Sequence, residues 1–324
     1  MVNDSVLRQI QDSLLLSANR SMKWIGEGMA GLPLARIGSS LVAIPLALVM
    51  LLLGGWYFTA GFCLLVFLGQ LEYFQLAKAK GLAPAIKTTL IVSQVLLVLS
   101  NVNPALADAL FPIAGTFICF YLLFQTKMAS IADIAASVLG LFYGGYLPSF
   151  WIRLRALQQL DFSNLPLDGF WITSWKTVTV QGLPQGLSHI VLAFFCIWAA
   201  DIGAYVFGRI LGRTRLSDIS PKKTVEGAIF GFAGSLGIAI VGAWVLHWPF
   251  FVVSGASFGL LIAVSSLLGD LTESLMKRDA GVKDSGALIP GHGGILDRTD
   301  SYVFTAPLVY YFVTLLLPLL SNIG

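Results

Sequence analysis

Charged side chains are scarce in this sequence. Asp, Glu, Lys and Arg together make up 11% of the 324 residues, whereas hydrophobic residues make up 56%. Because soluble domains carry about 25% charged residues, the composition excludes an ordinary soluble protein. Only three cysteines occur, Cys63, Cys119 and Cys196, all inside apolar runs, and their spacing indicates neither a disulfide framework nor a metal site. Residues 1–35 also lack the pattern of a cleavable signal peptide, and we interpret them as an amphipathic surface helix or a mobile arm.

Long apolar runs dominate instead, and the mean hydropathy is +0.82. A helix of roughly 20 apolar residues spans a bilayer. The runs predict an all-α, polytopic integral membrane protein with about nine transmembrane helices, at 36–53, 56–76, 86–100, 105–124, 130–151, 187–207, 225–246, 250–276 and 301–320. We therefore divide the chain into an N-terminal segment (1–35), five helices with a polar external loop (36–186), and a C-terminal region of four helices (187–324) that we expect to hold the functional site.

The distribution of Lys and Arg residues predicts how the helices are oriented across the membrane. If the nine helices alternate across the membrane, 17 of the 20 Lys and Arg residues fall on one side. Only Arg153, Arg155 and Lys176 fall on the other. Cytoplasmic loops carry the excess of Lys and Arg, so the pattern predicts a cytoplasmic N-terminus.

Three acids lie inside apolar helices near the predicted cytoplasmic side: Asp201, Asp270 and Glu273. Glu273 shares a helix face with Asp270 and with Lys277. A charged side chain near the bilayer centre costs at least ~2.5 kcal/mol, so such acids are paired or functional. Two interpretations stay open: pairing with loop cations, or binding of a divalent metal. Glu72, in the second helix, either lines the same cavity or pairs with Lys78 or Lys80.

Two basic loops lie on the same predicted side as these acids. The first contains Lys222 and Lys223, and Ser220 followed by Pro221 predicts the start of a helix there. A helix N-terminus flanked by lysines attracts anions. The second is the stretch 274–300, SLMKRDAGVKDSGALIPGHGGILDRTD, whose cations are Lys277, Arg278, Lys283 and Arg298. Cations beside carboxylates that hold Mg²⁺ are what phosphoryl or nucleotidyl transfer needs.

The end of this stretch adds two acids and a histidine. Asp297 and Asp300 are three residues apart, and we expect Asp300 or Ser301 to cap the last helix while Asp297 points back toward the loop. His292 lies among glycines that allow the backbone to approach a ligand closely. We favour a phosphate contact over a general base for His292.

The stretch resembles the signature of phosphatidate cytidylyltransferases, also called CDP-diacylglycerol synthases. The matching residues are Ser274-Leu-Met-Lys277-Arg278, then Lys283-Asp284, then His292-Gly293-Gly294-Ile295-Leu296-Asp297-Arg298-Thr299-Asp300. Ser-Pro-Lys-Lys-Thr-x-Glu-Gly at 220–227 and Asp-x-x-Ala-Tyr at 201–205 also look like the family. The resemblance is clear from about residue 195 onward and covers only the general helix pattern before it.

The resemblance implies a polytopic membrane enzyme that uses CTP and phosphatidate and yields CDP-diacylglycerol and pyrophosphate. It implies Mg²⁺, with K⁺ as a plausible second cation, and a homodimer as a family-level expectation. Its implied metal ligands are Asp270 and Asp297, supported by Asp201. The implied catalytic residues are Asp270, Asp297, Lys277, Arg278 and Lys283. The implied substrate-binding residues are Lys222, Lys223, Thr224, Glu226, Ser274, Asp284, His292, Gly293, Gly294, Arg298 and Asp300.

The expected location is a bacterial inner membrane with the site on its cytoplasmic side, or an organelle membrane. No nucleic-acid partner is expected. Two other functions remain in view: a CTP-dependent polyprenol or phytol kinase, and an ion or solute transporter. The nearly unbroken signature argues against the kinase. A transporter favours mid-membrane acids and repeated halves, whereas these acids lie at one side and no repeat is visible.

Overall fold

A computed structural model of the chain describes residues 41, 45–125, 128–157, 183–286, 288 and 293–321. Several predictions lie outside these residues: the segment 1–35, most of the external loop, and the phosphate contact of His292. The first predicted helix, 36–53, is only partly described, and its residues 45–53 are helical.

Within the described residues every regular element is a helix, which confirms the all-α class, and a bridge pairs Arg215 with Thr224. The elements are α3 (Gly55–Ala79), α4 (Ile86–Val102), α5 (Pro104–Leu123), α6 (Ile131–Leu141), the π-helical turn η1 (Phe142–Tyr146), α7 (Leu147–Arg155), α8 (Gln185–Leu211), α9 (Val225–Val245), α10 (Phe251–Asp279), α11 (Leu296–Val303), α12 (Thr305–Tyr311), the π-helical turn η4 (Phe312–Leu316) and α13 (Leu317–Ser321). The elements of Ile131–Arg155 together form one span, and so do those of Leu296–Ser321. Within the described residues, seven spans are therefore long and apolar enough to cross a membrane, and α4 is a shorter eighth.

These eight described spans coincide with the second to ninth predicted helices, with one large error. The last span begins at Leu296, whereas the sequence predicted 301. The predicted caps are wrong for the same reason. Asp300 and Ser301 both lie inside α11, after its first turn, so neither caps it. Likewise, Thr224 rather than Ser220 caps α9, because its hydroxyl accepts a hydrogen bond from the Gly227 amide at 3.2 Å.

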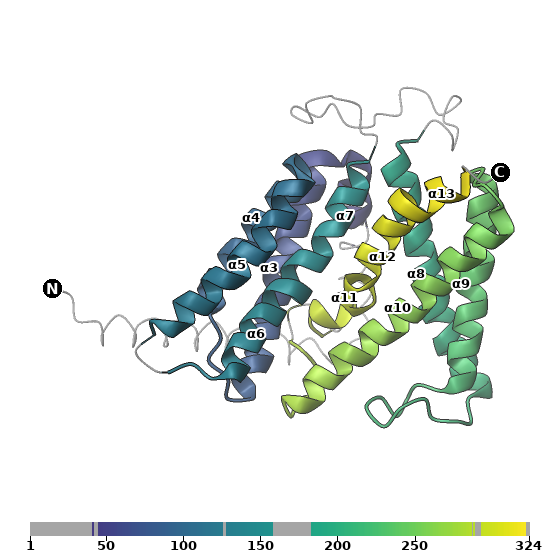
Figure 1. Cartoon of the computed structure of the whole chain (residues 1–324). Helices are drawn as coiled ribbons and strands as arrows, with labels where there is room; N and C mark the ends of the chain where they lie inside the picture. The colour runs from purple at the N-terminus through teal and green to yellow at the C-terminus, as the bar shows by residue number, and fades with distance from the viewer. Residues whose placement is uncertain are drawn as a thin grey trace.

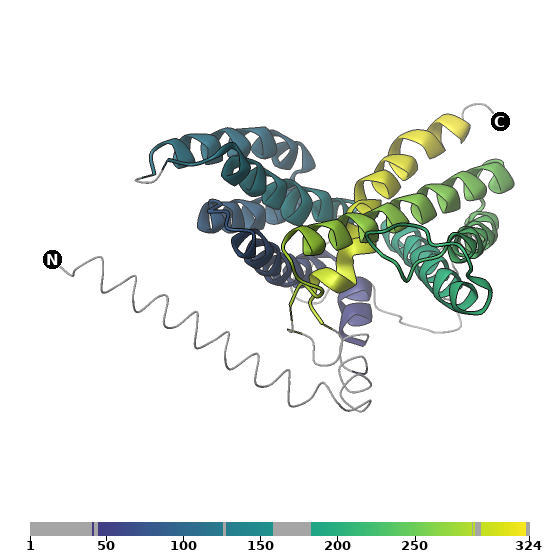
Figure 2. The ribbon, with the colours of Figure 1, turned by 90° about the horizontal axis from the view of Figure 1, so that it is seen from below.

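The helices form two groups with the last span between them (Figures 1 and 2). One group contains α3 to α7 and the other contains α8, α9 and α10. Small residues let the second group pack closely: Gly231 faces the backbone of α8, and the Ser235 hydroxyl donates to the Gly259 carbonyl at 2.9 Å. The span α11–α13 contacts α10 on one side and α7 on the other. Its first turns therefore lie where the two groups meet.

The connections alternate between the two ends of the bundle. Those after α3, α5, α8 and α10 lie at the lower end in Figure 1, and together they hold most of the Lys and Arg residues that lie between helices. Arg153 and Arg155, two of the three exceptions to the charge pattern, are buried side chains within the first group. They therefore carry no loop charge against the predicted orientation, which stays a prediction.

The buried Arg153 gives a test of packing in the first group. Its guanidinium pairs with Asp108 at 2.7 Å, and their side-chain exposures are 1% and 47%. Removing Asp108 strands a buried cation, whereas removing Arg153 leaves a half-exposed carboxylate that still accepts a hydrogen bond from Tyr146. We therefore expect Asp108→Ala to lower the free energy of unfolding by about 3 kcal/mol, and Arg153→Met by clearly less. Thermal unfolding in detergent, followed by tryptophan fluorescence, compares the two variants, and equal losses would contradict this account.

Candidate functional site

A polar cleft of about 640 Å³ lies between α8, α9 and α10, at their basic end. Asp201 of α8 and Asp270 of α10 line it, together with Lys222 and Lys223 from the loop before α9. Arg298 of α11 completes the wall. Segments far apart in the sequence thus bring carboxylates and cations to one cavity, as the two basic loops predicted.

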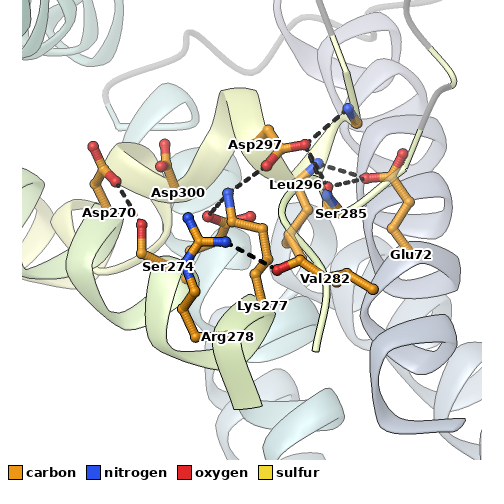
Figure 3. A network of polar contacts seen from close by, with 12 residues as sticks. Glu72, Asp270, Ser274, Lys277, Arg278, Val282, Ser285, Leu296, Asp297 and Asp300 are labelled. Atoms are coloured by element: carbon orange, nitrogen blue, oxygen red, sulfur yellow. Dashed lines mark hydrogen bonds and ion pairs between the residues drawn. The ribbon is translucent and has the colours of Figure 1, made fainter. Parts of the chain in front are cut away.

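The acids in the cleft are close to one another. Asp270 forms an ion pair with Lys223 and accepts a long hydrogen bond from the Ser274 hydroxyl at 3.4 Å. Asp300 lies beside Asp270 in Figure 3, near enough that the charges of Asp270 and Asp201 act on it. Asp201 itself accepts from Ser266 at 3.4 Å. Pairing with a loop lysine therefore explains the position of Asp270 in part. A single lysine, however, lies beside a group of several neighbouring carboxylates.

Asp297 lies on the other side of the α11 N-terminus, and it is bonded on both oxygens (Figure 3). Its Oδ1 pairs with Lys277 at 2.5 Å. Its Oδ2 accepts from the Ser285 amide at 3.0 Å, the Ser285 hydroxyl at 2.9 Å and the Gly294 amide at 2.9 Å. The expectation that Asp297 points back toward the loop is thus correct. Asp297 joins the two ends of the loop that connects α10 to α11.

Lys277 also pairs with Glu273, one turn earlier on α10, at 2.5 Å. The Glu273 side chain is fully buried, and its contact among the described residues is with Lys277. The ammonium group of Lys277 is therefore shared by two carboxylates. For Glu273 the pairing interpretation holds, and this acid is not part of the polar cleft.

Glu72 is the residue that the sequence did not resolve. It is 1% exposed on α3, and its carboxylate accepts from the Leu296 amide at 2.8 Å, the Ile295 amide at 3.1 Å and the Ser285 hydroxyl at 3.1 Å. Neither interpretation from the sequence is right: Glu72 does not line the cleft, and Lys80 pairs with Asp279 instead. Glu72 supplies an anion at the N-terminus of α11, where unpaired amides and the helix dipole favour one.

The glycines of the signature fit around these carboxylates. Gly293 has φ +85°, a conformation that side chains disfavour. Gly294 presses against Glu72 and Ser285, so that a Cβ there would overlap both. Their described role is to let the loop fold tightly onto Glu72 and Asp297. A contact with substrate at these glycines stays a prediction.

Other predicted substrate residues lie around this core. Glu226 accepts hydrogen bonds from the backbone amides of Arg213 and Thr214, at 3.1 to 3.2 Å, so it shapes the loop before α9. Arg278 donates to the Val282 carbonyl at 3.1 Å. Lys283 and Asp284 are exposed on the loop after α10, and neither lines the cleft.

The metal expectation can be compared with these positions. Among the described residues, no three His, Cys, Asp or Glu side chains lie close enough together to hold a metal ion by themselves. Mg²⁺, however, is commonly held by one or two carboxylates together with substrate phosphates. Asp270 with its neighbour Asp300 fits that pattern once Lys223 releases Asp270, and Asp297 fits it only if Lys277 releases it.

Known proteins are similar to this chain over most of its length. The Cytidylyltransferase family matches residues 34–316. A phosphatidate cytidylyltransferase of Synechocystis is 62% identical over 90% of this chain and 100% of its own length. The Arabidopsis chloroplastic phosphatidate cytidylyltransferases 4 and 5 are 40% and 41% identical, over 84% and 82% of this chain and 71% and 68% of theirs. A match along most of the chain, and to relatives covered over most of their length, means that this protein belongs to the cytidylyltransferase family, in its phosphatidate cytidylyltransferase group.

Proposed function

We propose that the protein transfers the cytidylyl group of CTP to phosphatidate and so forms CDP-diacylglycerol and pyrophosphate. The observation that carries this proposal is the polar cleft, in which Asp201 and Asp270 face Lys222, Lys223 and Arg298. The relatives named phosphatidate cytidylyltransferase support it. Nothing favours the polyprenol kinase or the transporter: the relatives carry another name, and Asp201 and Asp270 line one cleft at the basic end of α8, α9 and α10.

In this reaction a phosphatidate oxygen attacks the α-phosphorus of CTP. A new P–O bond forms, the bond from the α-phosphorus to the bridging oxygen breaks, and pyrophosphate leaves with that electron pair. The nucleophile is already an anion, so no strong general base is required. The main task of the protein is to hold two anionic substrates together and to offset their repulsion.

The described residues divide this task. Lys222, Lys223 and Arg298 line the cleft and bind phosphate oxygens there. Lys277 and Asp297 hold the loop between α10 and α11 in place beside the N-terminus of α11. Asp270, with Asp300 and Asp201 near it, would hold Mg²⁺, with Asp297 as a further ligand once freed from Lys277. The chemistry that Mg²⁺ supplies when bound is neutralisation of the phosphate charges. The cleft lies at the basic end of the bundle, and this supports a reaction on the cytoplasmic side, with a bacterial inner membrane or an organelle membrane as the expected location.

The proposal predicts a specific dependence of product on substrates and metal. Membranes containing the protein, given CTP labelled in the cytosine and phosphatidate, should form a labelled lipid. Chelation of Mg²⁺ should abolish that product, and added Mg²⁺ should restore it. Membranes lacking the protein serve as the control. Label that enters lipid only with a polyprenol acceptor, or no labelled lipid at all, would reject the proposal.

A further inference from the structure

A second cavity, which we call the apolar chamber, lies beside the polar cleft. Its volume is about 280 Å³, and it runs along α3 from Phe58 to Gln70. At 1.5 Å per residue, these twelve steps correspond to about 18 Å. Its other walls come from residues 47–51, η1, α7, α8 and α11, and the side chains that line it are largely aromatic and aliphatic, among them Phe58, Phe62, Val66, Trp151, Phe194 and Trp198.

The chamber and the cleft share one residue, Arg298. The helices around Arg298 also face both cavities. On α8, Trp198 lines the chamber and Asp201, three residues later, lines the cleft. On α11, Tyr302 lines the chamber one turn after Arg298, and its hydroxyl accepts from the Trp198 indole at 2.6 Å. A guanidinium therefore stands where an apolar cavity meets a polar one.

We infer that the apolar chamber binds one acyl chain of phosphatidate and that Arg298 holds the phosphate of the same lipid at the edge of the cleft. This inference rests on the proposed function. In phosphatidate the anionic phosphate is joined to apolar acyl chains. Arg298 and the apolar chamber lie next to each other in the same order, so the phosphate can contact Arg298 while a chain enters the chamber. The volume is close to the lower limit for ligand pockets, about 300 Å³, so it suits one chain while the other stays in the bilayer.

The effect of such a chamber is on position rather than on hydrophobic energy. Lipid tails are as apolar as the chamber, so a chain gains little by leaving the bilayer. A chain held beside α3 does, however, fix the phosphate relative to CTP, and correct placement of two reactants is a large part of the rate. Blocking the chamber should thus lower kcat/KM for phosphatidate and leave the KM for CTP unchanged.

Gly69 offers a way to block the chamber without disturbing the helix. It lies on α3 and lines the chamber, and a Cβ there would meet only Ile295, at 3.9 Å, which is ordinary contact. Gly69→Ala therefore fits, whereas the longer side chain of Gly69→Leu enters the chamber. Gly115→Leu is the matched control, because Gly115 lies on α5, outside the chamber, with nothing within 4 Å of an added Cβ.

Purified protein in detergent micelles, given CTP and dioleoyl phosphatidate, tests the inference. Gly69→Leu should lower kcat/KM for phosphatidate at least tenfold, about 1.4 kcal/mol. Gly115→Leu should stay within about twofold of the wild type, because nothing lies within 4 Å of an added Cβ at that position. An active wild type with an equally active Gly69→Leu variant would overturn the inference alone. An inactive wild type would instead count against the proposed function.

A binding measurement separates the substrate from bystander lipid. Phosphatidate with a diazirine at the end of one chain, after illumination, should label Phe58–Val66 of α3 or Phe194–Trp198 of α8. Excess dioleoyl phosphatidate should compete this labelling away, and Gly69→Leu should abolish it. Equal labelling by a diazirine phosphatidylcholine would show that the chamber holds any bilayer lipid, and this too would overturn the inference.

Discussion

Glu72→Ala is expected to lower the kcat of cytidylyl transfer about 100-fold, although Glu72 touches neither cavity. Misplacement of catalytic groups by about 1 Å costs that much. Glu72 accepts from Ile295, Leu296 and Ser285, and it is thereby the connection from α3 to the loop that carries the signature. Without its carboxylate, two buried amides at the start of α11 lose their acceptor, each at a cost of about 1–3 kcal/mol.

Glu72→Gln separates charge from shape at the same position. The glutamine amide has nearly the same size but carries two N–H donors, and all the groups that face Glu72 are donors. One backbone amide of Ile295 or Leu296 must then lose its bond. We expect an intermediate loss of kcat, with a smaller change in the KM for CTP, because the loop and not the CTP contacts is disturbed.

A purely structural effect of Glu72 would appear as instability. The control is Asp108→Ala, which we expect to destabilise the first helix group while touching no residue of 274–300. Measured well below both melting temperatures, Asp108→Ala should keep near wild-type kcat. If both variants lose activity in proportion to their loss of stability, Glu72 has no specific positioning role.

The positions of the helices could be predicted from the sequence, whereas the contacts of Glu72 could not. Hydropathy is a local property, so the eight described spans could be predicted within a few residues, except where α11 begins. The residues 297–300 are polar, and they are helical because Glu72, Asp297 and Ser285 bond the N-terminus of α11. The partners of Glu72 are 213 to 224 residues away. A pattern of neighbouring residues cannot reveal contacts at such a separation in sequence. The nearby Lys78 and Lys80 instead suggested an ion pair for Glu72.

The candidate site divides in the same way. The composition of the loops predicted a cavity that combines carboxylates and cations, and the described cleft has that composition. The sequence did not distinguish the acids from one another. Asp270 and Asp300 lie together beside the cleft, whereas Glu273 and Asp297 share Lys277. This sorting depends on the angle at which α11 crosses α10, which is set by tertiary packing.

Asp297→Asn is expected to reduce cytidylyl transfer by roughly 10²–10³-fold, the range found when one preorganised polar group is lost from an active site. Both oxygens of Asp297 face donors: Lys277 on one side, and Ser285 and Gly294 on the other. An asparagine side chain must turn its own N–H groups toward one of these sets. The loop between α10 and α11 then loses either its ion pair or its amide bonds.

The control is Asp279→Asn, at the end of α10. Asp279 pairs with Lys80, and the two side chains are 61% and 47% exposed. Exposed pairs contribute about 0–1 kcal/mol, so this variant should transfer within about twofold of the wild type. It removes the same charge from the same region, and it therefore shows whether net charge alone matters.

Titration with Mg²⁺ then separates two explanations for the loss in Asp297→Asn. If Asp297 acts mainly as a metal ligand, its removal weakens the metal site and a higher Mg²⁺ concentration restores activity. If it acts mainly by holding the loop, saturating Mg²⁺ restores nothing. We expect the second result, because Lys277, Ser285 and Gly294 already occupy both oxygens of Asp297. Full activity of the variant in ordinary Mg²⁺ would exclude both roles, provided that size-exclusion chromatography in detergent shows it folded.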